Sequence, residues 1–408
     1  MSHTVCVARI MNLISPRGFF RMYHSTTIFN QLLSFVPKNH FRRFVGQHGA
    51  DRYVKKLTAW NQFVVLMYAQ ATGKDSLRDI ETGLSVQTHL WHHLGIRSAA
   101  KSSVARANNH RSYKVFEQLF YALLAQCKDI TSSRLFTFEN PLYSLDATTI
   151  ELCLSLCDWA HYRHAKGAVK LHVLLHHGTE IPEVVNVTTG KVADITAAKK
   201  MRIGIPRGSI LVFDRGYFDF DWWNTLHEQG IFFVTRTKTV TLFLVSGQHG
   251  KSSGRISKDE KGWVGDICKA RYPREVRRVT YQHDDGEVYE YLTNNFTLSG
   301  EEIALIYKER WRIELFFKWI KQNLTIKSFL GTSKNAVLSQ VWVAMSYYLL
   351  LSYIKFQTRF DGSLLELTRM VRETLFTRRT LIDLLSLSLA TLNKFEIDEV
   401  EQLCLSGL

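Results

Sequence analysis

The sequence predicts an α/β protein in which a mixed β-sheet flanked by helices follows a helical N-terminal region. Residues 27–139 show the apolar spacing of helices. Residues 140–238 alternate between strand-like and helical segments, in the order three strands, helix, strand, helix, strand, which is typical of a layered α/β domain. Residues 239–294 break this alternation and predict an inserted antiparallel β subdomain.

The composition indicates a folded, basic protein with a polyanionic partner. The chain has 408 residues, enough for two or three domains, and 46% of them are hydrophobic, which excludes a disordered chain. Lys and Arg total 52 against 37 Asp and Glu, a net charge of +15. This charge favours nucleic acid as the partner, ahead of an anionic membrane surface, for which the chain lacks a basic amphipathic helix. A merely basic protein is the alternative.

Cysteine usage and hydropathy both predict a cytoplasmic protein. The six cysteines are scattered, and only Cys153 and Cys157 lie close together, so no second pair completes a zinc site. This usage is typical of a reducing compartment. The longest apolar stretch, residues 341–354, has 14 residues. Because roughly 20 are needed to cross a bilayer, this stretch predicts a buried helix.

The N-terminal third of the chain carries most of the excess charge. Residues 1–139 hold 18 Lys and Arg against 7 Asp and Glu, a net charge of +11. Helices are predicted over residues 56–71 and 103–127. The first half of the second helix contains three basic residues, Arg106, Arg111 and Lys114. The pattern favours a small helical DNA-binding domain, with a solvated basic face as the alternative.

Residues 1–26 are expected to be a basic, dispensable extension. The first 50 residues contain no Asp or Glu but six Lys and Arg. A transit peptide, a DNA-contacting arm and a true start at Met22 are the alternatives.

The elements of the α/β region can be placed in order. Strands are predicted over residues 142–152, 169–175, 183–188, 209–214 and 231–236. Helices are predicted over residues 194–201 and 220–229. In the insertion, Trp263 is interpreted as a core residue of a small sheet, with base stacking as the alternative.

The strongest helix signal covers residues 299–324. It starts with a capping box made by Ser299 and Glu302. At 100° per residue, five of its polar side chains share an arc of about 80°. They are Tyr307, Arg310, Glu314, Lys318 and Lys321. The stripe is either a functional face or a solvent-exposed face held by salt bridges between residues four apart.

Three carboxylates can be combined into one metal site. Asp146 lies within the first predicted strand, Asp214 ends an apolar strand, and Glu314 lies on the late helix. Carboxylates at strand ends of an open α/β sheet face the usual site crevice. Three such groups repel one another unless cations lie between them, and two divalent ions would meet this need. Ligands that are all oxygen favour Mg2+ or Mn2+ over zinc.

In this order the residues resemble the DDE transposases of bacterial insertion sequences, in the subgroup with a Y-x2-R-x3-E-x6-K signature. The signature reads Tyr307, Arg310, Glu314 and Lys321. A D-x-G-Y-x-x-F motif reads Asp214, Gly216, Tyr217 and Phe220, and the first motif reads Asp146-Ala-Thr148. The resemblance covers roughly residues 27–375.

The resemblance implies a ribonuclease-H-like catalytic domain in which Asp146, Asp214 and Glu314 bind two Mg2+ or Mn2+ ions and are catalytic. It implies that Tyr307, Arg310 and Lys321 contact DNA phosphates. The enzyme would bind the terminal inverted repeats of its element, cleave the ends and join the 3′ hydroxyls to target DNA. It would act as a homodimer in a synaptic complex, in the bacterial cytoplasm and associated with the nucleoid.

The expected domains follow from these assignments. They are a basic extension (1–26), a helical DNA-binding domain (27–139), a ribonuclease-H-like catalytic domain (140–238 and 295–375), a β insertion (239–294) and a C-terminal helical segment (376–408). Two rival functions use the same scaffold: a catalytically silent DNA-binding protein and a nuclease that does not join strands. A second possible metal cluster, His172 with His176 and His177, is interpreted as structural.

Overall fold

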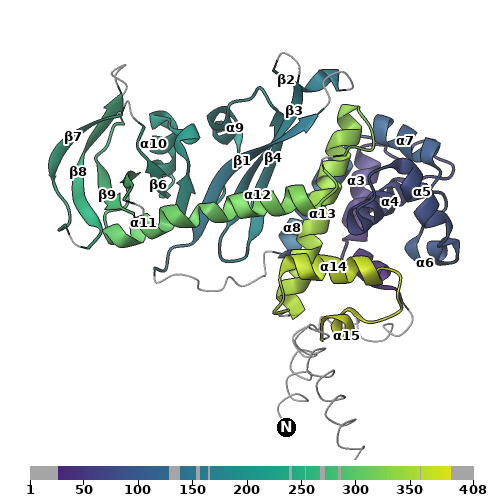
Figure 1. Ribbon diagram of the computed structural model, residues 1–408. Helices are drawn as coiled ribbons and strands as arrows, with labels where there is room; N and C mark the ends of the chain where they lie inside the picture. Colours follow the sequence, from purple (N-terminus) through teal and green to yellow (C-terminus); the bar gives the residue numbers. More distant parts are fainter. Residues whose placement is uncertain are drawn as a thin grey trace, which may run out of the picture. The chain divides into compact units, whose positions relative to one another are not determined.

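The chain folds into two compact units, a helical unit and a sheet unit (Figure 1). The helical unit comprises Met1–Ile130 and Lys321–Leu408, and the sheet unit comprises Thr131–Ile320. The computed structural model describes residues 26–127, 138–152, 157–163, 166–238, 241–252, 254–266, 272–283, 286–326, 328–358 and 360–386. The expected extension therefore lies outside the described residues, except for Thr26.

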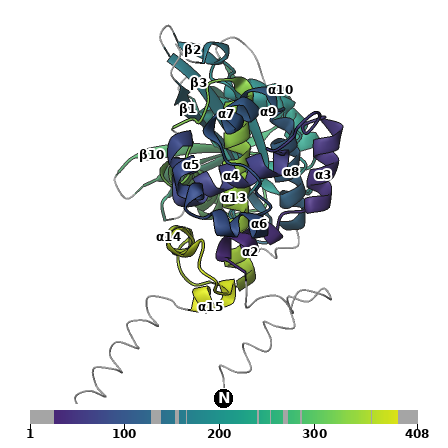
Figure 2. The same ribbon diagram turned by 90° about the vertical axis from the view of Figure 1, so that its right-hand side faces the viewer.

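The helical unit is built around one long apolar helix, α13 (Lys334–Thr358), which is buried from Ala336 to Leu351. Figure 2 shows it among the N-terminal helices. It packs against α4 (Ala59–Thr72), α7 (Lys101–His110), α8 (Lys114–Gln126) and α14 (Leu364–Thr374). The other α-helices described in this unit are α2 (Ile28–Ser34), α3 (Lys38–Gln47), α5 (Leu77–Ser85), α6 (Trp91–Leu94) and α15 (Leu381–Ser386).

Among the described residues, α13 alone is long and apolar enough to cross a membrane. Its most apolar 18-residue window is 89% buried inside the protein. The core helix of a folded domain passes the same test of length and composition. The buried helix expected over residues 341–354 is therefore confirmed as part of α13.

The packing of α13 also groups the C-terminal helices with the N-terminal ones. The expected catalytic domain continued to residue 375, whereas the structure groups the chain from Lys321 onward with the helical unit. The apolar surfaces of α4 and α8 are covered by α13, which explains this grouping. Side chains add hydrogen bonds: Asn335 Oδ1 accepts from the Tyr113 amide at 3.4 Å, and Gln340 Oε1 accepts from the Leu330 amide at 2.9 Å.

The helix predicted over residues 103–127 is interrupted at Arg111, which has an extended backbone with ψ of 139°. Its side chain is 8% exposed, so it does not belong to a basic surface. The guanidinium donates to the carbonyl oxygens of Ala50 and Leu57 and to Gln62, and it pairs with Asp51 at 3.2 Å. Arg111 therefore ties the start of α8 to the loop before α4.

The sheet unit contains one mixed sheet of ten strands. Its order is β2-β3-β1-β5-β6-β10-β9-β8-β7, and β4 also pairs with β3. β1 is parallel to β5 and β5 is parallel to β6, whereas the other pairs are antiparallel. The strands are β1 (Leu142–Leu152), β2 (His161–Arg163), β3 (Lys166–His176), β4 (Ile181–Thr189), β5 (Ile210–Phe213), β6 (Phe232–Arg236), β7 (Thr241–Gln248), β8 (Ile256–Asp266), β9 (Val276–Gln282) and β10 (Val288–Thr293).

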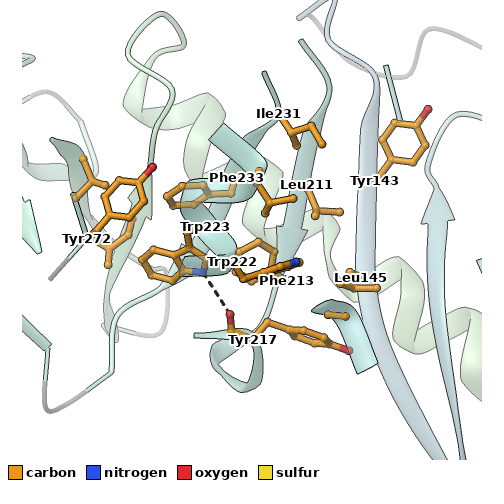
Figure 3. Close-up of a cluster of buried hydrophobic side chains, with 14 of the residues drawn as sticks. Tyr143, Leu145, Leu211, Phe213, Tyr217, Trp222, Trp223, Ile231, Phe233 and Tyr272 are labelled. Carbon is orange, nitrogen blue, oxygen red and sulfur yellow. Dashed lines mark hydrogen bonds between the residues drawn. The ribbon is translucent and has the colours of Figure 1, made fainter. Parts of the chain in front are cut away.

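Alternate residues of the central strands face two different apolar cores. Leu211 and Phe213 of β5 pack with α9 (Asp194–Lys200) and α10 (Phe220–Glu228), in the aromatic cluster that Figure 3 shows. Ile210 and Val212 face the other way and pack with α11 (Gly300–Glu309). The sheet thus lies between two helical layers, and all strands and helices predicted over residues 142–236 are present.

The insertion extends this sheet instead of forming a small sheet of its own, because β10 pairs with β6. The core position expected for Trp263 is wrong: its side chain is 45% exposed, opposite Leu244 of β7. The next residue, Val264, is 1% exposed and takes the core face, as the alternation of side chains along a strand requires.

The helix predicted over residues 299–324 forms as two helices, α11 and α12 (Trp311–Asn323), separated by Arg310. The capping box of Ser299 and Glu302 is present. Around the break the Arg310 amide bonds the Tyr307 carbonyl and the Ile313 amide bonds the Arg310 carbonyl, each at 3.2 Å. These are three-residue spacings, so the chain tightens at Arg310 into a 3₁₀-like turn.

Candidate active site

Two parallel strands bring Asp146 and Asp214 side by side. The pairing of β1 with β5 ends at Leu145 and Phe213. Asp146 is the next residue on β1, and Asp214 is the first residue after β5. Leu145 and Phe213 face the α9 and α10 core, so the following residues point toward the α11 face. Each carboxylate also accepts a backbone amide, Ala147 at 2.7 Å and Gly216 at 2.8 Å.

The junction of α11 and α12 adds two charged side chains to this pair. Arg310 Nη1 lies 3.6 Å from Asp146 Oδ2, and Arg310 Nη2 lies 2.7 Å from Glu314 Oε1. One guanidinium therefore joins a carboxylate of the sheet to a carboxylate of the helix. The salt bridge from Arg310 to Glu314 was expected for a solvent-exposed face, but its further contact with Asp146 and an exposed fraction of 17% place Arg310 in the site.

Asp146 is the electrostatically unusual member of the group. Burial raises the pKa of its carboxyl to about 7, and the negative charges of Asp214 and Glu314 act in the same direction. The Ala147 amide and the Arg310 guanidinium oppose the rise in pKa without cancelling it. Burial therefore favours the protonated form of Asp146 until further positive charge reaches the site.

Tyr307 lies beside the Arg310 guanidinium. Its ring is 4.9 Å from that of Tyr291 on β10, and the Arg310 guanidinium lies 5.6 Å from the ring centre. Burial raises the pKa of the Tyr307 hydroxyl, although Arg310 and Arg236 both lower it. The ring thus positions Arg310 from one side while the carboxylates hold it from the other.

Two predicted stripe residues follow Glu314 farther along α12. Lys318 is exposed on α12. Lys321 follows Glu314 by seven residues, a rise of roughly 10 Å along the helix, and it is the first residue past the sheet unit. The structure therefore brings together Asp146, Asp214, Glu314, Arg310 and Tyr307.

The donor set suits a hard divalent cation, because it consists of carboxylate oxygens on three elements. The positively charged group among them is Arg310, which occupies oxygens of both Asp146 and Glu314. In the described part of the chain, no group of three His, Cys, Asp or Glu is already arranged to hold a metal ion. Asp146, Asp214 and Glu314 fit the metal chemically once the guanidinium moves.

The sequence of this region matches a known family, the one described as "Transposase DDE domain", over residues 137–350. That match spans more than half of the 408 residues. The chain belongs to this family. Residues 24–97 match a second family, described as "Domain of unknown function (DUF4372)".

Relatives of this DDE transposase agree with the assignment. "Putative transposase y4zB" of Sinorhizobium fredii is 32% identical over 69% of this chain and 79% of the relative. "Probable transposase for insertion sequence element IS5377" of Geobacillus stearothermophilus is 29% identical over 63% of this chain and 68% of the relative. A solved "piggyBac transposase synaptic complex with hairpin DNA" covers 95% of this chain and 87% of its own, at 12% identity and a TM-score of 0.43, too distant to add to the assignment.

As a DDE transposase, the protein is an enzyme of metal-dependent DNA cleavage and strand transfer. Its family uses divalent metal ions, and its macromolecular partner is DNA. The predicted enzyme class is confirmed.

One basic residue of this region escaped the sequence analysis. Arg236 ends β6, and the parallel register of β5 and β6 makes it the neighbour of Asp214. Its guanidinium lies 3.6 Å from the ring centre of Tyr289, which holds it near the end of β6. The signal was present in the sequence, because Arg236 ends a predicted strand just as Asp214 does.

The histidines considered as a second metal site have structural partners. His172 is fully buried and hydrogen-bonds Thr188 at 2.9 Å, and His177 bonds Ser144 at 2.6 Å. Burial lowers the pKa of His172 to about 4. Lys170, on the same strand as His172, pairs with Asp194 at 3.0 Å.

Proposed function

We propose that this transposase binds the terminal inverted repeats of its own insertion sequence, cleaves the ends and joins the 3′ hydroxyls to target DNA. The convergence of Asp146, Asp214 and Glu314 carries the proposal: two neighbouring strands supply the aspartates, and Arg310 bridges from Asp146 to Glu314. The spacing of Tyr307, Arg310, Glu314 and Lys321 supports membership of the Y-x2-R-x3-E-x6-K subgroup.

The topology supports a ribonuclease-H-like catalytic domain. Asp146 lies on the first strand, and Glu314 lies on a late helix. Asp214 follows β5, which is the fourth strand when the three-residue β2 is left out. The insertion falls between the second and third acids and extends the sheet from β6. This is the arrangement that the family resemblance implies.

Each side chain has a defined role in this proposal. Asp146, Asp214 and Glu314 would hold two Mg2+ or Mn2+ ions, which when bound activate a water or hydroxyl and stabilise the leaving 3′ oxygen. Arg310 would bind a DNA phosphate through its planar pair of donors. Tyr307 would orient Arg310, and Lys321 would contact a phosphate farther along the strand. These phosphate contacts fix the position of the DNA end relative to the carboxylates.

We assign recognition of the inverted repeats to the helical unit. Residues 1–139 carry a net charge of +11, and phosphate contacts dominate the affinity of proteins for DNA. We further propose that the protein acts as a homodimer in a synaptic complex, so that two ends are cut together, and that it works in the cytoplasm, associated with the nucleoid.

The decisive experiment separates binding from cleavage on a duplex that carries the inverted repeat flanking the gene. Asp146→Asn, Asp214→Asn and Glu314→Gln should bind this duplex like the wild type and fail to nick it, because each removes a metal ligand. Glu309→Gln is the matched control, since Glu309 pairs with Arg312. Lys321→Ala should instead weaken binding in a gel-shift assay.

Three results would contradict the proposal in different ways. Wild-type cleavage by Glu314→Gln would remove the helix from the site. Binding without cleavage by the wild-type protein in Mg2+ or Mn2+ would support the silent DNA-binding alternative. Cleavage without joining, measured with precut 3′ hydroxyl ends and a target plasmid, would identify a nuclease.

A further inference from the structure

We infer that Arg310 is a displaceable internal cation that couples DNA binding to metal loading. In the free protein its guanidinium neutralises Asp146 and Glu314. When a DNA end arrives, the guanidinium moves to a phosphate and releases both carboxylates to the metal ions. The inference rests on the proposed function, because it takes the carboxylates as metal ligands.

The position of Arg310 is the first observation. Its two terminal nitrogens lie 3.6 Å from Asp146 Oδ2 and 2.7 Å from Glu314 Oε1, so it takes up oxygens that a cation between these side chains would need. A guanidinium and a divalent ion are both attracted by the same two negative charges. They cannot fill the same space, so metal binding has to displace Arg310.

The incomplete bonding of Arg310 is the second observation. Its Nε is buried without a hydrogen-bond partner, and the 3.6 Å contact with Asp146 is an ion pair beyond hydrogen-bond distance. Only Glu314 among the carboxylates holds it closely. A buried donor without a partner carries a free-energy penalty, which a phosphate with several acceptor oxygens would remove.

The backbone at Arg310 is the third observation. The residue lies between α11 and α12, where the hydrogen bonds switch to three-residue spacing. Such a break in a helix is a point at which a few dihedral angles can adjust. The guanidinium can therefore change partners while both helices stay intact.

The exchange has a thermodynamic consequence. If DNA withdraws Arg310 from the carboxylates, DNA must strengthen metal binding, and metal must strengthen DNA binding by the same factor. The site would then fill with metal chiefly on a bound DNA end, which limits nicking of DNA elsewhere. Arg310 thus acts as a positioning residue with two alternative anionic partners.

The test measures Mn2+ binding to the full chain from the electron paramagnetic resonance signal of free Mn2+. We expect Arg310→Gln without DNA to bind Mn2+ about tenfold more tightly than the wild type. The inverted-repeat duplex should tighten Mn2+ binding by the wild type and leave Arg310→Gln nearly unchanged, after subtraction of Mn2+ bound to the duplex alone. Arg312→Gln is the matched control, because Arg312 pairs with Glu309 and Glu180 and should behave like the wild type.

The controls separate this inference from the proposed function. If Asp146→Asn and Glu314→Gln lose Mn2+ binding while Arg310→Gln binds no better than the wild type, the metal site stands and the displacement is wrong. If Asp146→Asn keeps full Mn2+ binding, the proposed site itself is wrong. Should Arg310→Gln not fold, Arg310→Lys decides: a single ammonium cannot bridge both carboxylates, so Mn2+ affinity should rise, and an unchanged affinity overturns the inference.

Discussion

At Asp146 the fold places a carboxyl group between two other carboxylates and largely out of water. Its pKa of about 7 in the folded protein lies above its ordinary value of 3.8. Between these pH values the folded chain keeps a proton that the unfolded chain releases. The stability that Asp146 contributes is therefore complete below pH 3.8 and is lost as the pH rises through 7. At the pH where a metal-binding carboxylate must be ionised, the ionised Asp146 therefore lowers the free energy of unfolding.

This pH dependence of stability leads to a prediction for the metal-free protein. Asp146→Asn removes the ionisable group, so the free energy of unfolding of the variant relative to the wild type should increase from pH 5 to pH 8, by about 2.5 kcal/mol. Urea unfolding with a chelator at the two pH values measures the difference. Asp221→Asn, at an exposed position on α10, is the control. Parallel pH profiles for the wild type and Asp146→Asn would contradict the prediction.

At the scale of elements, local periodicity predicted most strands but missed the places where two predicted helices are interrupted. The strand pattern of residues 142–236 was read correctly because each run alternates or is apolar throughout. The breaks at Arg111 and Arg310 were missed, because both residues are good helix formers and tertiary contacts decide their conformation. The carboxylate cluster was predictable from motif order, whereas the Arg310 contact with Asp146 was not, since it joins residues far apart in the chain.

The break at Arg111 gives a prediction about stability. Arg111→Met should lower the free energy of unfolding by about 3 kcal/mol, because it leaves Asp51 and two carbonyl oxygens without their buried donor. Arg106→Met, at an exposed position on the preceding helix, is the matched control and should change stability by less than about 0.5 kcal/mol. Urea unfolding measures both variants, and equal effects would show that Arg111 belongs to the surface after all.

At the scale of the whole molecule, the positive charge and the buried centre of the helical unit come from different parts of the chain. The positive charge is concentrated in residues 1–139, yet the buried centre of the helical unit, α13, comes from residues 334–358. A fragment that stops at residue 139 would expose the apolar faces of α4 and α8 that α13 covers. DNA binding by the helical unit therefore has to be tested in the full chain, by changing charges and leaving the core intact.

The double variant Arg42→Gln/Arg43→Gln makes this test on α3, where both residues are exposed. If the helical unit contacts the DNA backbone there, the variant should bind the inverted-repeat duplex more weakly. Its plot of log affinity against log salt concentration should be shallower by up to about two units, since each lost phosphate contact reduces the slope by nearly one. The control, Lys251→Gln/Lys258→Gln, removes the same charge from exposed positions of the insertion. An equal loss in both variants would indicate a general charge effect, whereas a loss confined to α3 would assign DNA binding to the helical unit.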